Sequence, residues 1–150
     1  MITQPAEHLT PLEGIIGRWR SSGSALDGDG STVVATISGT DVYTWASSGN
    51  WIVHDVDVLM GDERTLVTEL IGGRDAESDG WQMHAFDKSE SPGQMSLIPQ
   101  SDGTLLLQGQ GVRSWLNIAA GPGLMTARWE REPEPGTWTL WMDMRFEREP

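Results

Sequence analysis

The sequence predicts an all-β protein, an antiparallel up-and-down β-barrel of about ten strands preceded by a short N-terminal helix. Beyond residue 16, short runs with β-like alternation are separated at regular intervals by Gly, Asp, Ser and Pro. Short separators favour pairing between consecutive strands, which gives a meander. A closed barrel is one of the two architectures with this rhythm, the other being a sandwich.

The first expected element is a helical turn or two over residues 6–16. Its apolar residues recur at helical spacing, but Pro11 and Gly14 keep the segment short. The apolar positions are Leu9, Leu12, Ile15 and Ile16.

The β-like runs follow in order, and some neighbours could join as one bent strand. Separators such as residues 27–30 and 133–136 supply the positive φ angles and preset proline angles that tight turns require. No linker or internal repeat interrupts the pattern, so one domain is expected over residues 1–150. The runs are 17–26, 32–38, 40–47, 50–60, 65–72, 80–87, 93–98, 104–110, 111–119, 123–131 and 137–148.

Two strands predict which side chains face inward. In the run from residue 50, His54 shares an apolar row with Ile52, Val56, Val58 and Met60, so it should point into the barrel. In the last run, Trp141 breaks the polar face and is expected under a loop, under the helix or at a subunit contact. The inward set expected there is Trp138, Leu140, Met142, Met144 and Phe146.

Composition removes several function classes. The chain has no cysteine, which excludes disulfides and thiolate metal sites. A net charge of −12 disfavours nucleic acid and anionic membranes as partners. The first residues lack the basic and apolar regions of a secretion signal, and no apolar run is long enough for a membrane span. We therefore expect a cytoplasmic protein.

The segment Gly17-Arg18-Trp19, which opens the first strand after a short helix, resembles the G-x-W signature of the calycin superfamily. This resemblance implies that Trp19 closes one end of the barrel beneath an arginine of the last strand. Arg145 and Arg148 are the two candidates, and a cation–π contact gives the pairing a physical reason. Gly17, Trp19 and this arginine are the expected structural residues.

Over nearly the whole length, the chain resembles a bacterial lipocalin-like family of unknown function related to nitrobindins and fatty-acid-binding proteins. The resemblance implies a ten-stranded barrel with an internal cavity and no established activity. Nitrobindins bind haem through a histidine in the last third of the barrel, where this chain has none, so haem is disfavoured. The matching pieces are LEGIIGRWR (12–20), Trp45, GNWIV (49–53), WQMHAFD (81–87), Trp129-Glu130 and Gly136-Thr137-Trp138.

The candidate ligand-binding residues follow from this expected cavity. His54 is the most informative, since an imidazole on an apolar row needs a hydrogen-bond partner. Asp55 cannot supply it, because consecutive strand residues face opposite ways. His84 and Arg113 have undecided orientations; an inward Arg113 would suit a carboxylate ligand and could pair with Glu69. The remaining candidates, from the many tryptophans and methionines, are Trp45, Trp129 and Met142.

The leading hypothesis is a binding protein for a small hydrophobic molecule, without catalytic residues, metal or cofactor. An alternative is a cyclase or isomerase that acts on a hydrophobic metabolite, with His54 or His84 as general acid–base. The disfavoured alternative is a haem protein like the nitrobindins. Self-association into a homodimer through exposed aromatics such as Trp141 is a further alternative that is compatible with ligand binding.

Overall fold

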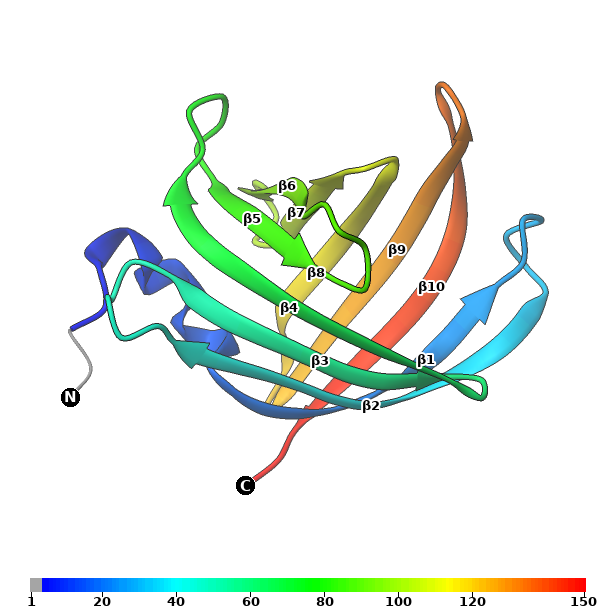
Figure 1. The fold of residues 1–150 in the computed structure, drawn as a ribbon, viewed down its shortest axis with the longest axis horizontal. Helices are drawn as coiled ribbons and strands as arrows, with labels where there is room; N and C mark the ends of the chain where they lie inside the picture. Colours follow the sequence, from blue (N-terminus) through cyan, green and yellow to red (C-terminus); the bar gives the residue numbers. More distant parts are fainter. Residues whose placement is uncertain (1–3) are drawn as a thin grey trace.

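The structure, a computed structural model that describes residues 4–150, is a closed barrel of ten antiparallel strands. Each strand pairs with the next one along the chain, and β1 pairs with β10 to complete the ring. Figure 1 shows this up-and-down path. The strands are β1 (Gly17–Leu26), β2 (Val33–Trp45), β3 (Ile52–Met60), β4 (Glu63–Arg74), β5 (Trp81–Phe86), β6 (Gly93–Pro99), β7 (Leu105–Gly109), β8 (Val112–Gly121), β9 (Leu124–Glu134) and β10 (Thr137–Arg148).

The predicted fold class is thus confirmed, and the expected runs become ten strands because 32–38 and 40–47 join as β2. Gly39 lies at their junction. A Cβ atom built there would lie 2.2 Å from the carbonyl oxygen of Asp57 on β3. Only glycine lets the two backbones approach this closely, and the pairing of β2 with β1 and β3 continues through Gly39 without a shift in register.

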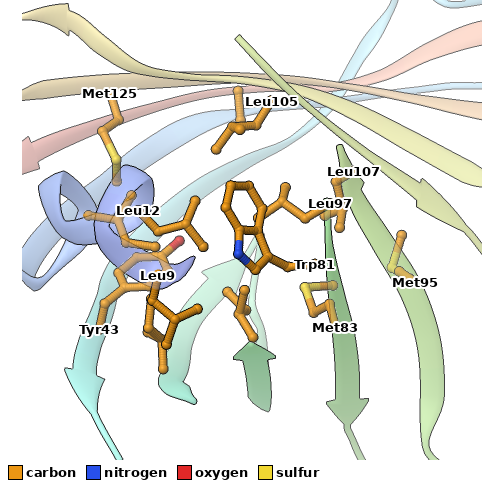
Figure 2. Close-up of a cluster of buried hydrophobic side chains, with 14 of the residues drawn as sticks. Leu9, Leu12, Tyr43, Trp81, Met83, Met95, Leu97, Leu105, Leu107 and Met125 are labelled. Atoms are coloured by element: carbon orange, nitrogen blue, oxygen red, sulfur yellow. The ribbon is translucent and has the colours of Figure 1, made fainter. Parts of the chain in front are cut away.

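A 3₁₀ helix, η1 (Glu7–Ile15), plugs one end of the barrel. Leu9 and Leu12 are fully buried and pack in one cluster with Trp81. Figure 2 shows the Trp81 indole at the centre of this cluster, with Leu9 and Leu12 on one side and Leu97 on the other. Trp81 also donates a hydrogen bond to the carbonyl oxygen of His8, at 2.9 Å, which ties the helix to β5. The expected helical turns are therefore confirmed.

Trp19 and Arg148 close the same end. The Arg148 guanidinium lies 4.3 Å from the Trp19 ring centroid and donates hydrogen bonds to the carbonyl oxygens of Gly14 and Ile16, at 2.8 and 2.7 Å. A Cβ atom at Gly17 would lie 2.4 Å from Arg148 Nη1, so glycine leaves room for the arginine. One guanidinium therefore joins the last strand to the first strand and to η1.

Of the two candidate arginines, Arg148 takes this position and Arg145 does not. Arg145 lies one step off the inward row of β10 and forms an ion pair with Glu147 at 3.4 Å on the surface. The expectation for Arg145 is therefore wrong, because Arg145 lies three positions before Arg148 and an odd offset places it on the opposite face of the strand.

An irregularity in β10 corrects the expected inward set. Met142, Met144 and Phe146 face inward as predicted. The register between β10 and β9 shifts between Leu140 and Met142, which reverses the alternation for the earlier residues. Trp138 therefore lies on the outer face, and Leu140 pairs with the outward Glu130. Trp141, expected under a loop, under the helix or at a subunit contact, faces the interior.

Within residues 4–150, none of the helical segments has the length and apolarity needed to cross a bilayer.

Replacing Arg148 with alanine should lower the free energy of unfolding by about 2 kcal/mol, since it removes a cation–π contact and two hydrogen bonds to backbone carbonyls. Arg145→Ala, on the same strand, is the matched control and should change it by less than about 0.5 kcal/mol. Urea denaturation followed by tryptophan fluorescence measures both values. Equal effects of the two variants would show that Arg148 does not hold this end closed.

Candidate functional site

A cavity of about 260 Å³ lies inside the barrel. Its lining comes from β2 to β10, and Ile15 of η1 bounds it at the plugged end. Most lining side chains are apolar, including Trp129 and Trp141, whose rings meet edge to face with centroids 6.3 Å apart. The polar side chains in the lining are Asp41, Tyr43, His54, Thr65, Glu69 and Ser114.

His54 stands between two carboxylates on the β2–β4 wall. Its Nδ1 lies 2.5 Å from Glu69 Oε1, and its Nε2 lies 2.7 Å from Asp41 Oδ2. The strand register produces this arrangement, because His54 is directly opposite Glu69 on β4 and Tyr43 on β2. We call Asp41, His54 and Glu69 the charged trio.

Two neighbours complete the surroundings of the charged trio. Ser21 on β1, which is 1% exposed, donates a hydrogen bond to Asp41 Oδ1, so both oxygens of that buried carboxylate have partners. The Tyr43 ring stacks on the imidazole with centroids 3.9 Å apart and planes 8° from parallel. Burial, together with the Asp41 and Glu69 carboxylates, raises the pKa of the Tyr43 hydroxyl well above its usual value. Tyr43 is therefore a neutral phenol.

The geometry makes His54 an imidazolium. Two carboxylate acceptors face the two ring nitrogens, and both nitrogens carry a proton only in the charged form. Burial by itself lowers the pKa of His54, but attraction to Glu69 and Asp41 and hydrogen bonds to both outweigh this effect and raise the pKa to about 9. With both acids ionised, the charged trio carries one net negative charge.

Ser114 is the polar group of the opposite wall. It lies on β8, five strands away from β3 in either direction around the ring. Its side chain lines the cavity, the residue is 1% exposed, and Oγ has no hydrogen-bond partner within the described part of the chain. A buried hydroxyl without a partner is uncommon in proteins and destabilises the unoccupied cavity.

The structure brings four of the seven expected ligand-binding residues together. His54, Glu69, Trp129 and Met142 all line the cavity. Trp45 faces the same interior but packs against the buried cluster near η1, outside the cavity lining.

His84 and Arg113 lie on the outer face of the barrel. The inward residue of this part of β5 is Met83, so the adjacent His84 points outward, where its ring meets Trp51 with centroids 5.7 Å apart. Arg113 alternates with the inward Ser114, pairs with Glu130 at 2.7 Å and lies 4.1 Å from the Trp138 ring centroid. Neither residue therefore reaches the cavity.

One expected partnership is corrected, and the expected orientation of Asp55 is confirmed. Glu69 pairs with His54 and not with Arg113, since the barrel wall separates the two. Asp55 lies on the outer face as expected and accepts a hydrogen bond from Thr68, at 2.9 Å.

Sequence reasoning missed Asp41, Ser21 and Ser114. For Asp41 the sequence did hold a signal, because Asp41 lies on the same row of β2 as the apolar Ile37 and Tyr43. Dividing β2 into two runs at Gly39 concealed this row. Ser114 lies on a mixed polar and apolar row of β8 with Leu116, and no local pattern distinguishes the inner face of this strand from its outer face.

The charged trio is not a metal centre. Within residues 4–150, no three His, Asp or Glu side chains are arranged to hold one ion. The reason is visible at His54, whose two nitrogens each face one carboxylate, so the imidazole occupies the place that an ion would take.

Comparison with known proteins adds no assignment. No protein-family model matches the chain, and no curated protein matches it significantly.

The His54 pKa of about 9 predicts a pH-dependent stability. A raised pKa in the folded state stabilises the protein fully below the unfolded-state value, near 6.5, and this gain is lost as the pH rises through about 9. The free energy of unfolding should fall by about 3 kcal/mol over this range, at about 1.4 kcal/mol per pKa unit.

Urea denaturation at a series of pH values measures this fall, and NMR of the imidazole nitrogens gives the pKa directly. His84→Gln removes an outer-face histidine and should leave the profile unchanged. A flat profile between about pH 6.5 and 9 would contradict the imidazolium assignment.

The two buried serines predict opposite effects of one substitution. Ser114→Ala removes an unpartnered hydroxyl and should raise the free energy of unfolding of the ligand-free protein by about 1 kcal/mol. Ser21→Ala removes the donor to the Asp41 carboxylate and should lower it by about 2 kcal/mol. Both residues are 1% exposed strand residues, so each is the other's control. Chemical denaturation measures the sign of each change in the free energy of unfolding. Destabilisation by Ser114→Ala would contradict the absence of a hydrogen-bond partner for the Ser114 hydroxyl.

Proposed function

We propose that this protein binds a small, largely apolar molecule inside the barrel. The observation that carries the proposal is the cavity of about 260 Å³ with a mostly apolar lining. This volume lies just below the usual range of ligand pockets, about 300–1,000 Å³, so the ligand is small. A few convergent polar groups in an apolar cavity are also typical of ligand sites.

The side chains around the cavity suit such a ligand. Trp129 and Trp141 offer aromatic surfaces, while Met60, Met142 and Met144 are flexible and can adapt to an irregular apolar shape. The Trp19–Arg148 contact and the ten-stranded meander support placing the chain in the calycin superfamily, near the lipocalin-like family related to nitrobindins and fatty-acid-binding proteins.

The haem alternative has little support. Among the described lining residues, His54 is the only histidine, and its nitrogens are 2.5 and 2.7 Å from carboxylate oxygens. An iron ligand would need one of these nitrogens free of its proton and turned toward the metal.

The cyclase or isomerase alternative meets the same obstacle. A strongly raised histidine pKa next to a cavity favours acid–base chemistry in general. However, both protons of the His54 ring are directed at Asp41 and Glu69, so none is available to a ligand while the charged trio is intact. We therefore rank binding above catalysis.

Filling the cavity tests the proposal. Ala127 is 4% exposed, lines the cavity and leaves space beside it, so Ala127→Phe should reduce the affinity for apolar probes at least about tenfold. Ala119→Phe, the same change at an exposed position of β8, should leave the affinity unchanged.

The measurement is quenching or enhancement of tryptophan fluorescence in a screen of aromatic and aliphatic probes, with native mass spectrometry of the purified protein to identify a retained ligand. If no probe binds the unmodified protein, or if both variants bind equally well, the cavity is not a binding site.

A further inference from the structure

The two carboxylates of the charged trio differ in how many of their oxygens have a hydrogen-bond partner. Asp41 uses both carboxylate oxygens, one toward Ser21 and one toward His54. Glu69 uses only Oε1, and no donor within residues 4–150 reaches Oε2. The Glu69 side chain keeps 15% of its surface accessible and lines the cavity. One carboxylate oxygen therefore remains available to a ligand.

The charge around this oxygen is negative. The imidazolium of His54 neutralises one of the two carboxylates, and none of the described lining residues is a lysine or an arginine. The Arg131 guanidinium lies 5.8 Å from the Trp141 ring centroid and donates to the carbonyl oxygen of Leu26 at 3.2 Å, and Arg131 is not among the lining residues. An uncompensated negative charge in an apolar cavity favours a cation or a hydrogen-bond donor and disfavours an anion.

Ser114 Oγ supplies an independent observation. This hydroxyl is buried, has no partner within the described residues, and lines the cavity from β8, on the opposite side of the ring from His54 on β3. The cavity thus has a negatively charged hydrogen-bond acceptor, Glu69 Oε2, on one wall and an unpartnered hydroxyl on the other, with apolar side chains between them.

From this geometry, and resting on the proposed binding function, we infer the chemical class of the ligand. It is an apolar molecule with a protonated amine or another strong donor that Glu69 Oε2 accepts, and with a second polar group that pairs with Ser114 Oγ. The sequence had left open a carboxylate ligand held by an inward Arg113, but Arg113 pairs with Glu130 and does not line the cavity.

Four probes of nearly equal size test the head group: octylamine, octanol, heptyl methyl ether and octanoate. The ether has no donor, so it cannot pair with Glu69 Oε2, and its affinity is the reference for binding without that hydrogen bond. Affinities at neutral pH, from tryptophan fluorescence and isothermal titration calorimetry, should follow the order amine, alcohol, ether, octanoate. A charge-assisted hydrogen bond should make the amine at least about tenfold tighter than the ether.

Variants assign this preference to Glu69. Glu69→Gln should reduce the amine-to-ether ratio of affinities to about one, while the ether affinity stays the same and shows that the cavity is intact. Glu63→Gln, the same change at an exposed residue of the same strand, should keep the full ratio.

A two-ended probe tests Ser114. Among amino alcohols of increasing chain length, one should bind more tightly than the alkylamine of equal length, and Ser114→Ala should remove this difference. Ser22→Ala, at an exposed position of β1, should retain it.

The outcomes separate this inference from the proposed function. If the ether binds but the amine is not preferred, or if octanoate is preferred, the inference is overturned and the barrel still binds apolar molecules. If neither the ether nor any other probe binds, the proposed function fails and the inference fails with it. A preference for the amine that Glu69→Gln abolishes supports both.

Discussion

The pairing of β1 with β10 is the constraint on which the other features depend. Once the ring is closed, each strand residue faces either the interior or the solvent, and successive residues alternate between the two. This division explains why Glu69 meets His54 while Arg113 meets Glu130. It also explains why the bulge in β10 matters, since one shifted residue moves Trp141 inside and Trp138 outside.

The two ends of the barrel interior are stabilised differently. At one end, η1 and the Trp81 cluster fill the space, and Arg148 holds the helix and both terminal strands together. Toward the other end, the interior is not filled, and the cavity begins. A plug at one end lets the domain retain a packed hydrophobic core while the rest of the interior stays available to a ligand.

The charged trio places ionic groups where an apolar core would be more stable. Burying charges is unfavourable unless they are paired and hydrogen-bonded, and in the charged trio only Glu69 Oε2 lacks a protein donor. Together with the unpartnered Ser114 hydroxyl, this oxygen is an exception to the rule that buried polar groups are satisfied. Exceptions of this kind concentrate at sites that have a function, and these two line the same cavity. His8 Nε2 on η1, a further buried polar atom without a partner within the described residues, does not line it.

The sequence by itself determined the local features. Alternation along β3 predicted that His54 faces inward, and turn residues predicted the strand boundaries to within a few positions. These two features depend on neighbours within one strand or turn, which a single sequence displays. The tryptophan and arginine closure was expected only because Gly17-Arg18-Trp19 resembles the calycin signature, since it joins the first strand to the last.

Only the tertiary structure decided which side chains meet. Asp41, His54 and Glu69 come from three strands, and their contact depends on the register of β2, β3 and β4. Likewise, the inward position of Ser114 and the choice of Arg148 over Arg145 depend on strand orientation within the closed ring. Register and closure arise from long-range pairing, and the short polar and mixed rows of β5 and β8 do not specify it locally.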